Sequence, residues 1–474
     1  MRKAFLPGAF TALLFLSASF IKAQTPPQPV LIATGDLTRT EAGSFTDLSG
    51  LTNTLENGDP ANMLGGLGSG IAWAGGHTFL ALPDRGPNAI NFADVNEGLA
   101  LDNTVTYIPR FHTISMEFHP NNKGGGLPFT LVPRIQSTTL LYSTDSLVYG
   151  AAKPALNIPS GVPPQNTGFK HFFTGRSDAF DPVQNSGNPL DARLDSEGIR
   201  VSNDGQHVYI SDEYGPYVYE FERATGRRTR AFQLPAHLFV SHLNSIGATE
   251  ISGNTSGRTA NKGMEGLAIT PDGKTLVGII QAAIIQDASQ GKAAKKVLRI
   301  EVMDIESGQT IHEFAYGLTD GSGVSEITAL NNHEFLVDER DGSGRGNGDV
   351  PVVKEIFKID LDGAVDVSNM DGTHAAANVV KKTLFLDVVK ALVNAGFDPA
   401  HIPAKIEGVA LGPDIHQGGV RMHTLWVAND NDFLTTVADP NNIQIANPNQ
   451  FFVFGFTDDS LDGSQLVLQK IDED

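Results

Sequence analysis

Pairs of short hydrophobic runs, each joined by a polar turn, recur along the chain. In one pair, residues 197–201 and 208–213 flank the turn Asn203-Asp204-Gly205, and in another the runs flank Pro271-Asp272-Gly273. The runs are rich in the β-branched and aromatic residues that favour strands, while Asn, Asp, Pro and Gly supply the backbone angles of tight turns. Each pair therefore predicts an antiparallel β-hairpin. The five hairpins expected in this way span residues 69–85, 197–213, 265–281, 326–339 and 407–430.

The spacing of the hairpins predicts a β-propeller. The hairpins begin 128, 68, 61 and 81 residues apart, which suits propeller blades with long insertions. The first interval leaves room for a further degenerate unit, for which residues 129–149 are the candidate. We therefore expect an all-β fold, a propeller of six or alternatively seven blades.

The sequence also predicts how the ring closes and where two helical insertions lie. The strand-like residues 29–33 are expected to close it against residues 451–456 and 466–470 at the other end of the chain. Short helical insertions are expected at 384–395, where apolar residues recur at helical spacing, and at 235–244.

Two columns of polar residues follow from aligning the hairpins. Glu197 and Asp212 are equidistant from their turn, so the pairing of antiparallel strands predicts that they face each other at the end away from it. One column stands at the start of the first strands and one at the exit of the second, and in a ring both converge on one mouth of the central channel. The first column holds Ser69, Glu197, Glu265, Glu326 and Glu407, and the second holds Asp84, Glu213, Gln281, Glu339 and Asp430.

Eight carboxylates in one mouth predict a bound cation, because like charges so close together are unfavourable without one. Oxygen ligands without thiolates suit calcium best and magnesium second. The expected metal ligands are Asp84, Glu197, Glu213, Glu265, Glu326, Glu339, Glu407 and Asp430. The bases Arg85, Lys262, Arg340 and Lys405 stand beside these positions and are expected to hold the phosphate of a small-molecule phosphoester. A purely structural interpretation stays open, in which Glu-Gly makes contacts between blades and the other acids are solvated. The 13 histidines show no paired metal spacing and are expected on the surface or in the core.

Composition narrows the possible partners and compartments. The chain of 474 residues carries 54 acids, 34 bases and no cysteine, a formal charge of −20. Such a charge disfavours nucleic acid and anionic membranes, and the lack of cysteine excludes disulfides and thiolate metal sites.

The first 23 residues are expected to be a signal peptide. A basic start at Arg2 and Lys3 precedes an apolar run over 9–20 and the small residue Ala23. Removing this segment takes away three bases and no acid, which leaves 31 bases against 54 acids and a charge of −23. Residues 24–29 are expected to be a linker and 30–474 the propeller domain. The mature protein is expected to be an exported monomer, periplasmic or extracellular, without membrane insertion.

The same residues carry a family resemblance. Residues 82–88, 195–199, 211–215, 261–267 and 405–409 resemble motifs of the phytase-like, "esterase-like activity of phytase", family of exported bacterial proteins. The resemblance implies a propeller related to calcium-dependent phytases and a hydrolase, without a defined catalytic set to carry across. Ser69 and Gln281 depart from a strictly repeated acid pattern.

Three functions follow as hypotheses from different classes. The leading one is an exported calcium-dependent hydrolase of phosphoesters acting at the acidic mouth. The alternatives are a lactonase or carboxylic esterase with a single central metal, and a non-enzymatic propeller that binds a protein or a glycan.

Overall fold

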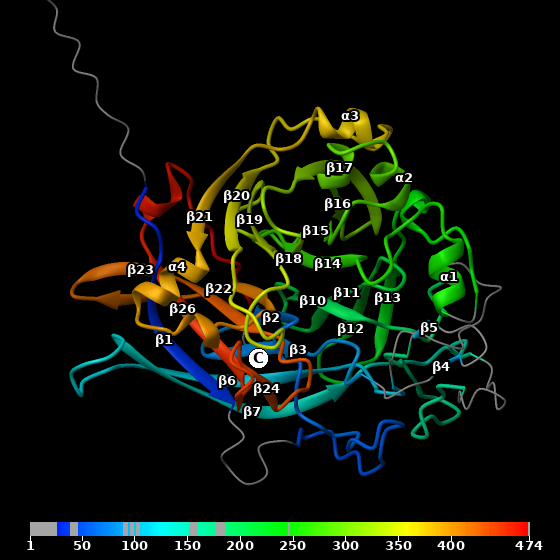
Figure 1. Cartoon of the computed structure of the whole chain (residues 1–474), viewed down its shortest axis with the longest axis horizontal. Helices are drawn as coiled ribbons and strands as arrows, with labels where there is room; N and C mark the ends of the chain where they lie inside the picture. Colours follow the sequence, from blue (N-terminus) through cyan, green and yellow to red (C-terminus); the bar gives the residue numbers. More distant parts are fainter. Residues whose placement is uncertain are drawn as a thin grey trace, which may run out of the picture.

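Five four-stranded antiparallel sheets form a ring in the computed structural model, with one strand of each sheet lining the central channel (Figure 1). The structure describes residues 26–37, 46–88, 93–94, 99–100, 105–150, 160–176, 186–244 and 247–472. The expected signal peptide, residues 1–23, lies outside these ranges, as do the first two residues of the expected linker 24–29. The fold is therefore an all-β propeller, as predicted.

Each blade runs from an inner strand outward. The first blade contains β2 (Gly70–Trp73), β3 (Thr78–Leu82), β6 (Arg110–Pro120) and β7 (Phe129–Leu140). The second contains β10 (Ser196–Val201), β11 (His207–Asp212), β12 (Tyr217–Glu222) and β13 (Arg228–Phe232). The third contains β14 (Met264–Ile269), β15 (Thr275–Ile280), β16 (Val297–Asp304) and β17 (Gln309–Gly317). The fourth contains β18 (Gly323–Ala329), β19 (Glu334–Arg340), β20 (Lys354–Asp360) and β21 (Lys382–Asp387). The fifth contains β22 (Ile406–Gln417), β23 (Val420–Asn429), β26 (Asn449–Phe456) and β1 (Val30–Leu37).

Short elements decorate this frame. The two-stranded pairs are β4 (Ala93–Asp94) with β5 (Leu99–Ala100), β8 (Tyr142–Ser143) with β9 (His171–Phe172), and β24 (Thr436–Ala438) with β25 (Gln444–Ala446). The α-helices are α1 (Gly247–Gly253), α2 (Ile285–Ala288), α3 (Gly372–Ala376) and α4 (Val388–Asn394). The 3-10 turns are η2 (Ala236–Leu238), η3 (Ala294–Lys296), η4 (Pro399–His401) and η5 (Asp458–Leu461). Within the described ranges, no helix combines the length and the apolar character needed to cross a membrane.

The ring closes as expected, but the predicted count of six or seven blades is wrong. Strand β1 pairs antiparallel with β26, with Leu31 opposite Phe454, so the two ends of the chain share the fifth blade. Residues 129–140, expected to begin an extra blade, instead form β7, the outer strand of the first blade, in a long ribbon with β6. The 128-residue interval is therefore used by this ribbon and by the loops before β10, and five blades remain.

Glycine explains how closely the inner strands approach one another. A Cβ on Gly198 would lie 2.8 Å from the backbone nitrogen of Leu267, and one on Gly266 would lie 2.7 Å from that of Ile327. These distances leave no room for a side chain, so the Gly of the repeated Glu-Gly pair packs blade against blade. The glycine of the repeated Glu-Gly pair thus has a structural role between neighbouring blades.

The predicted helices are shorter than expected. Residues 384–387 continue strand β21, and α4 begins only at Val388, where the Asp387 carboxylate accepts a hydrogen bond from the Lys390 nitrogen at 2.9 Å. An Asp in this position stabilises the first turn of a helix and fixes where it starts. Residues 235–244 contain only the single turn η2.

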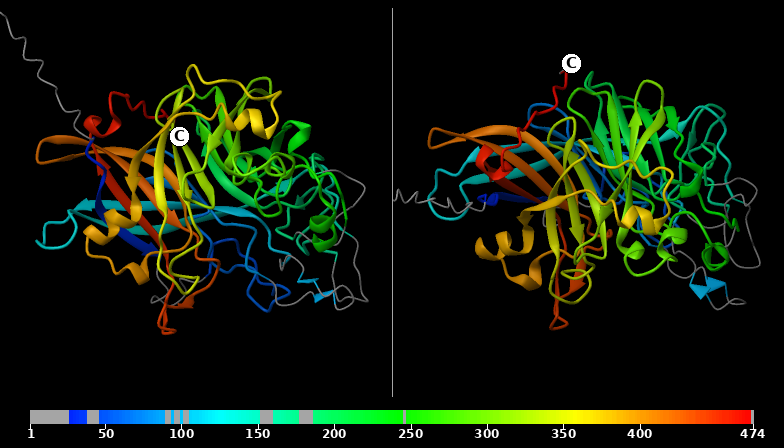
Figure 2. Two further views of the ribbon diagram at one scale, coloured as in Figure 1. Left: turned by 45° about the horizontal axis from the view of Figure 1, so that its top comes forward. Right: turned by 90° about the horizontal axis from the view of Figure 1, so that it is seen from above.

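The C-terminal segment covers one end of the channel instead of pairing as a strand. The Val467 nitrogen donates to the Leu330 carbonyl at 2.8 Å, and Gln469 Nε2 donates to the Val201 carbonyl at 2.7 Å. Both carbonyls follow or end inner strands, at the side of the ring away from the Glu-Gly positions. Figure 2 shows the end of the chain on the opposite side of the ring from the β24–β25 hairpin. The channel is therefore covered at this end.

Candidate metal centre in the propeller mouth

A β-bulge at the start of the inner strand places the repeated glutamate in four of the five blades. In the second blade Ser196 pairs with Asp212 and Ile199 pairs with Ile210, so Glu197 and Gly198 together oppose the single residue Ser211. The predicted pairing of Glu197 with Asp212 is thus wrong by one residue. The register also shifts at Met264/Gly266, Val324/Glu326 and Ile406/Val409. Bulges bend a strand and re-aim side chains, which accounts for the way Glu197, Glu265 and Glu407 leave the ladder. Glu326 instead follows its bulge and pairs with Asp338.

The mouth contains a cavity of about 220 Å³. Eight of the twelve predicted site residues line it, five acids and three bases. They are Asp84, Glu197, Glu213, Glu265, Glu407, Lys262, Arg340 and Lys405. Eight residues from hairpins that begin up to 338 residues apart therefore meet in one cavity.

Three glutamates form the centre of this cavity. Glu197, Glu213 and Glu265 each offer a carboxylate oxygen within 4.8 Å of the other two, and all three are buried. Glu213 accepts a hydrogen bond from the Gly263 nitrogen at 3.2 Å, and Gln281 donates to Glu265 Oε1. Within the described part of the chain, Glu265 Oε2 has no hydrogen-bond partner, and none of the three makes a salt bridge to a base.

Burial and mutual repulsion raise the pKa of these carboxyls. Burial, followed by the charge of Glu265, raises the pKa of Glu197 and of Glu213 well above its ordinary value. The pKa of Glu265 is raised to about 8 by burial and by Glu407. Three buried acids that resist ionisation are a configuration that a divalent cation stabilises.

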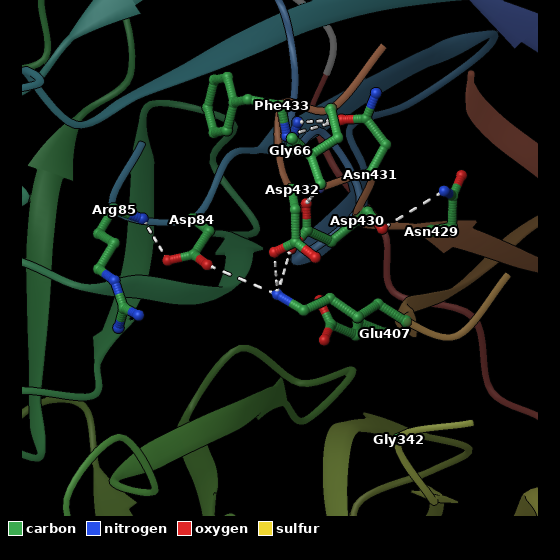
Figure 3. A network of polar contacts seen from close by, with 12 residues as sticks. Gly66, Asp84, Arg85, Gly342, Glu407, Asn429, Asp430, Asn431, Asp432 and Phe433 are labelled. Atoms are coloured by element: carbon green, nitrogen blue, oxygen red, sulfur yellow. Dashed lines mark hydrogen bonds and ion pairs between the residues drawn. The ribbon is translucent and has the colours of Figure 1, made fainter. Parts of the chain in front are cut away.

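Lys405 neutralises a second acidic group beside the triad. Its ammonium lies 2.8 Å from Asp430, 2.5 Å from Asp432 and 3.9 Å from Asp84. Figure 3 shows these three carboxylates converging, with Arg85 beside Asp84. Burial, followed by the charge of Asp195, raises the pKa of Asp84 to about 7.

The other predicted bases have distinct surroundings. Arg340 pairs with Glu407, and Arg85 pairs with Asp195 at 2.8 Å and contacts Asn261. Lys262 lines the cavity and donates to Gln281 Oε1 at 3.2 Å, so its hydrogen-bond partner is neutral.

Two predicted metal ligands lie away from the cavity. Glu326 sits deeper in the channel, 3.1 Å from Arg200, and accepts from the nitrogens of Leu267 and Ile327 at 3.0 Å. Glu339 bonds Lys382 at 2.5 Å and the Tyr316 hydroxyl at 3.0 Å, and its other oxygen accepts from the backbone of residues 319–321. Its column position predicted the mouth, but these partners hold it on the side of the fourth blade.

Sequence reasoning missed Arg200, Asp195 and Asp432. Arg200 lies inside the channel and donates to the carbonyls of Ile71, Ile199, Ile327 and Val409 at 2.6–3.2 Å. Asp195 stands two residues before Glu197 in one of the resembling motifs, and Asp432 two residues after Asp430, so both could have been found by extending the motifs. Nothing in the pattern distinguishes Arg200 from an ordinary strand residue.

Unusual backbone angles occur beside the mouth. Asn261, Asp432 and Phe433 have φ values of 53°, 51° and 57°, in the left-handed region that side chains rarely adopt. The Asp432 nitrogen donates to Asp430 Oδ1 at 2.7 Å, and Asn431 Oδ1 accepts from the nitrogens of Phe433 at 3.2 Å and Gly66 at 2.8 Å. Such strained positions are held by their surroundings and cluster at functional sites.

The charges of the mouth fit a divalent cation. Eight carboxylates lie in or beside the cavity, the five that line it together with Asp195, Asp430 and Asp432, against the four bases, which leaves a formal charge of −4. The donors around the Glu197–Glu213–Glu265 group are oxygens, which suits calcium or magnesium. The unpartnered oxygen of Glu265 is the observation that fits a ligand there.

With this geometry in place, comparison with known sequences assigns the family. The profile of the phytase-like family, described as "Esterase-like activity of phytase", matches residues 62–433. The chain belongs to the phytase-like family. The matched region contains all twelve predicted site residues, and the family description indicates a propeller hydrolase.

Individual relatives add less. An "Uncharacterized secreted protein" of Arthroderma benhamiae is 36% identical to this phytase-like chain over 181 residues, and the match covers 32% of the chain and 35% of that relative. The chain thus spans about a third of the length of this curated relative. Among solved structures, hydrazine synthase of Kuenenia stuttgartiensis aligns at 11% identity with a TM-score of 0.31, over 77% of this chain and 78% of its own. A putative 6-phosphogluconolactonase of Bacteroides uniformis aligns at 13% identity with a TM-score of 0.30, over 90% and 99%. TM-scores this low carry no argument about function.

Proposed function

We propose that this phytase-like propeller is an exported hydrolase that cleaves phosphoesters at its acidic mouth and depends on calcium. The Glu197–Glu213–Glu265 group carries the proposal, because its three buried carboxylates converge without a base among the described residues. The family description, with its esterase-like activity, supports ester hydrolysis as the reaction class.

Glu197, Glu213 and Glu265 would hold the calcium ion, with magnesium as the second choice. When bound, a divalent ion polarises a phosphoryl oxygen and lowers the pKa of a coordinated water. A mouth with a formal charge of −4 repels a phosphate, so binding of the cation and binding of the substrate are coupled in this proposal.

The bases would orient the phosphate at the rim of the cavity. Lys262 is the best placed of them, because its hydrogen-bond partner is the neutral Gln281 and not a carboxylate. Arg340 and Lys405 already pair with Glu407 and Asp430, so they serve mainly to hold those carboxylates in place.

Two carboxyls are suited to move the proton. Asp84 and Glu407 line the cavity, and burial raises the pKa of each to about 7. A group with a pKa near the working pH exchanges a proton efficiently, so either can accept the proton of an attacking water.

A lactone or carboxylic ester is the second candidate substrate. The negative mouth favours this class, since a neutral ester is not repelled by the acids that oppose a phosphate. A non-enzymatic binding propeller is the third possibility and is an outcome of the same test.

The test compares ester classes with and without metal. We expect purified protein to hydrolyse members of a phosphomonoester panel, to lose this activity with chelator and to regain it with calcium. Glu265→Gln should remove turnover while leaving the melting temperature close to that of wild type. The matched control is Glu306→Gln, an exposed acid in the turn between β16 and β17, which should retain full activity.

Three outcomes separate the hypotheses. Hydrolysis of lactones alone would replace the phosphoester proposal with the second candidate. Activity that chelator leaves unchanged would refute the dependence on metal. No turnover on any ester, with calcium binding that Glu265→Gln abolishes, would point to a binding propeller.

We also propose export as a monomer. The secreted relative and the expected signal peptide support export. N-terminal sequencing of the protein recovered outside the cytoplasm should show a chain that begins at Gln24. Size-exclusion chromatography should give a mass close to that of one chain.

A further inference from the structure

A second group of possible metal ligands lies on the third blade, outside the propeller mouth. Glu301 on β16 and Glu313 on β17 face each other directly in the strand register. His237, on η2 in the segment between the second and third blades, approaches the same point. One ligand atom from each of the three lies within 4.8 Å of the other two.

Glu301 is the unusual member of this group. Its side chain is 0% exposed, and neither carboxylate oxygen has a hydrogen-bond partner among the residues that the structure describes. A buried carboxylate left without partners is strongly unfavourable. Something absent from the protein chain, either a proton or a cation, must therefore satisfy it.

The neighbouring charges favour a cation. Glu313 pairs with Arg299 through Oε1, and its Oε2 lies 3.1 Å from His237 Nε2. Arg299 is also held by Asp287 at 2.8 Å and by the Val367 and Met370 carbonyls, so its charge is shared between two acids. The three carboxylates and one guanidinium leave two negative charges, which one divalent ion would balance.

The ligand set selects the kind of ion. One imidazole nitrogen and two carboxylate oxygens suit a borderline ion such as zinc, whereas calcium prefers oxygen ligands alone. The His237 side chain is 34% exposed, but its Nε2, which faces Glu313, is buried. The buried Glu301 and Glu313 complete the inner side.

We propose that His237, Glu301 and Glu313 form a zinc site that fastens the segment between β13 and β14 to the third blade. The site is independent of the phosphoester proposal, because none of its residues lines the mouth cavity. Its expected role is structural, since the ion would connect strands β16 and β17 to a segment that otherwise contributes one short turn here.

Metal analysis of the full-length protein tests the proposal. After chelation and dialysis, zinc chloride should bind with one more equivalent in wild type than in His237→Ala or Glu301→Gln. We expect the affinity to fall by more than about 100-fold in either variant, since loss of an outer-shell partner alone costs about 10–100-fold. Zinc should also raise the melting temperature of wild type more than that of the variants.

The matched control is His312→Ala. His312 precedes Glu313 on β17, is 54% exposed and pairs with Asp366 at 2.8 Å, so it removes an imidazole beside the site but not from it. Zinc stoichiometry in this variant should equal that of wild type. If Glu301→Gln does not fold, His237→Ala alone decides, because the His237 side chain is only partly buried and stands on a short turn outside the sheet.

The contrary results are distinct. Failure of wild type to bind zinc would overturn the proposal and assign Glu301 a bound proton instead. Zinc binding that is unchanged in His237→Ala would equally overturn it, as would stabilisation by calcium but not by zinc.

Discussion

Replacing Arg200 with methionine should loosen the whole ring, because this one guanidinium joins four of the five blades. Its two terminal nitrogens donate to the carbonyls of Ile71, Ile199, Ile327 and Val409, which lie on β2, β10, β18 and β22. Arg200→Met keeps an unbranched apolar stem at this position but removes every one of these donors and the charge that faces Glu326.

The size of the effect follows from burial. Arg200 and Glu326 have side-chain exposures of 6% and 0%, and breaking a buried ion pair from one side costs about 3–5 kcal/mol. The loss is moderated at Glu326, because burial already raises its pKa to about 7 and it can take up a proton. We therefore expect a loss of about 4 kcal/mol. With an unfolding entropy of about 2.1 cal/mol/K per residue, this lowers the melting temperature by about 4–5 °C in a chain of this size.

Calorimetry at pH 8 in the presence of chelator measures the shift without a metal contribution. The matched control is Arg134→Met, whose pair with Glu117 is 58% and 43% exposed and should contribute less than about 1 kcal/mol. The double variant Arg200→Met/Glu326→Gln should be more stable than Arg200→Met alone, since it removes the unpaired acid. A melting temperature of Arg200→Met within 1 °C of wild type would refute the view that the guanidinium ties the blades.

Three further predictions follow from the mouth and the blade contacts. The metal-free protein should lose stability as pH rises from about 5 to 8. In the folded protein the pKa of Asp84, Glu265 and Glu407 is about 7, 8 and 7, and each is lower in the unfolded chain. The folded state therefore binds more protons in that window, and raising the pH favours unfolding. Melting curves with chelator and with calcium check this, and a flat or rising profile with chelator would contradict it. Lys405→Met should cost about 2–4 kcal/mol, somewhat less than the loss of a fully buried pair, because the Lys405 side chain is 28% exposed. Calcium should restore more stability to this variant than to wild type, since three acids lose their ammonium. Equal calcium responses would count against the second acidic group. Gly198→Ala should cost about 1–3 kcal/mol in urea unfolding, because its Cβ meets the Leu267 backbone at 2.8 Å, whereas Gly168→Ala, with open space around it, should be neutral.

The sequence allowed the hairpins and the ring closure to be predicted because both depend on local patterns. Alternating apolar residues and turn residues mark each inner hairpin, and the strand-like ends of the chain had few other places to pair. The blade count could not be obtained in the same way. The interval before β10 contains β6 and β7, which are long enough to resemble a hairpin of their own, and only tertiary pairing shows that they belong to the first blade.

The site was predicted in outline and missed in detail for a different reason. The column of glutamates depends on hairpin spacing, which the sequence shows, but the bulges that aim them depend on strand register, which it does not. Glu339 illustrates the limit: its column position matches Glu213, yet Lys382, 43 residues later, draws it to the side of the fourth blade. The proposed zinc ligands come from a 3-10 turn and two strands, so no fixed spacing connects His237 with Glu301.

Because the end of the channel away from the mouth is closed, the acidic mouth is the entrance to the cavity. The Glu326–Arg200 pair fills the channel below the cavity, and the C-terminal segment at Val467 and Gln469 covers the far side. A ligand must therefore reach the glutamate triad from the mouth, past acids that attract cations and repel anions. Under the proposed function this imposes an order, in which calcium binds first and lowers the negative potential before a phosphoester can enter. Under the same proposal, Lys262, Arg340 and Lys405 line the cavity without pairing with the triad, because an ammonium or guanidinium at its centre would take the place of the ion.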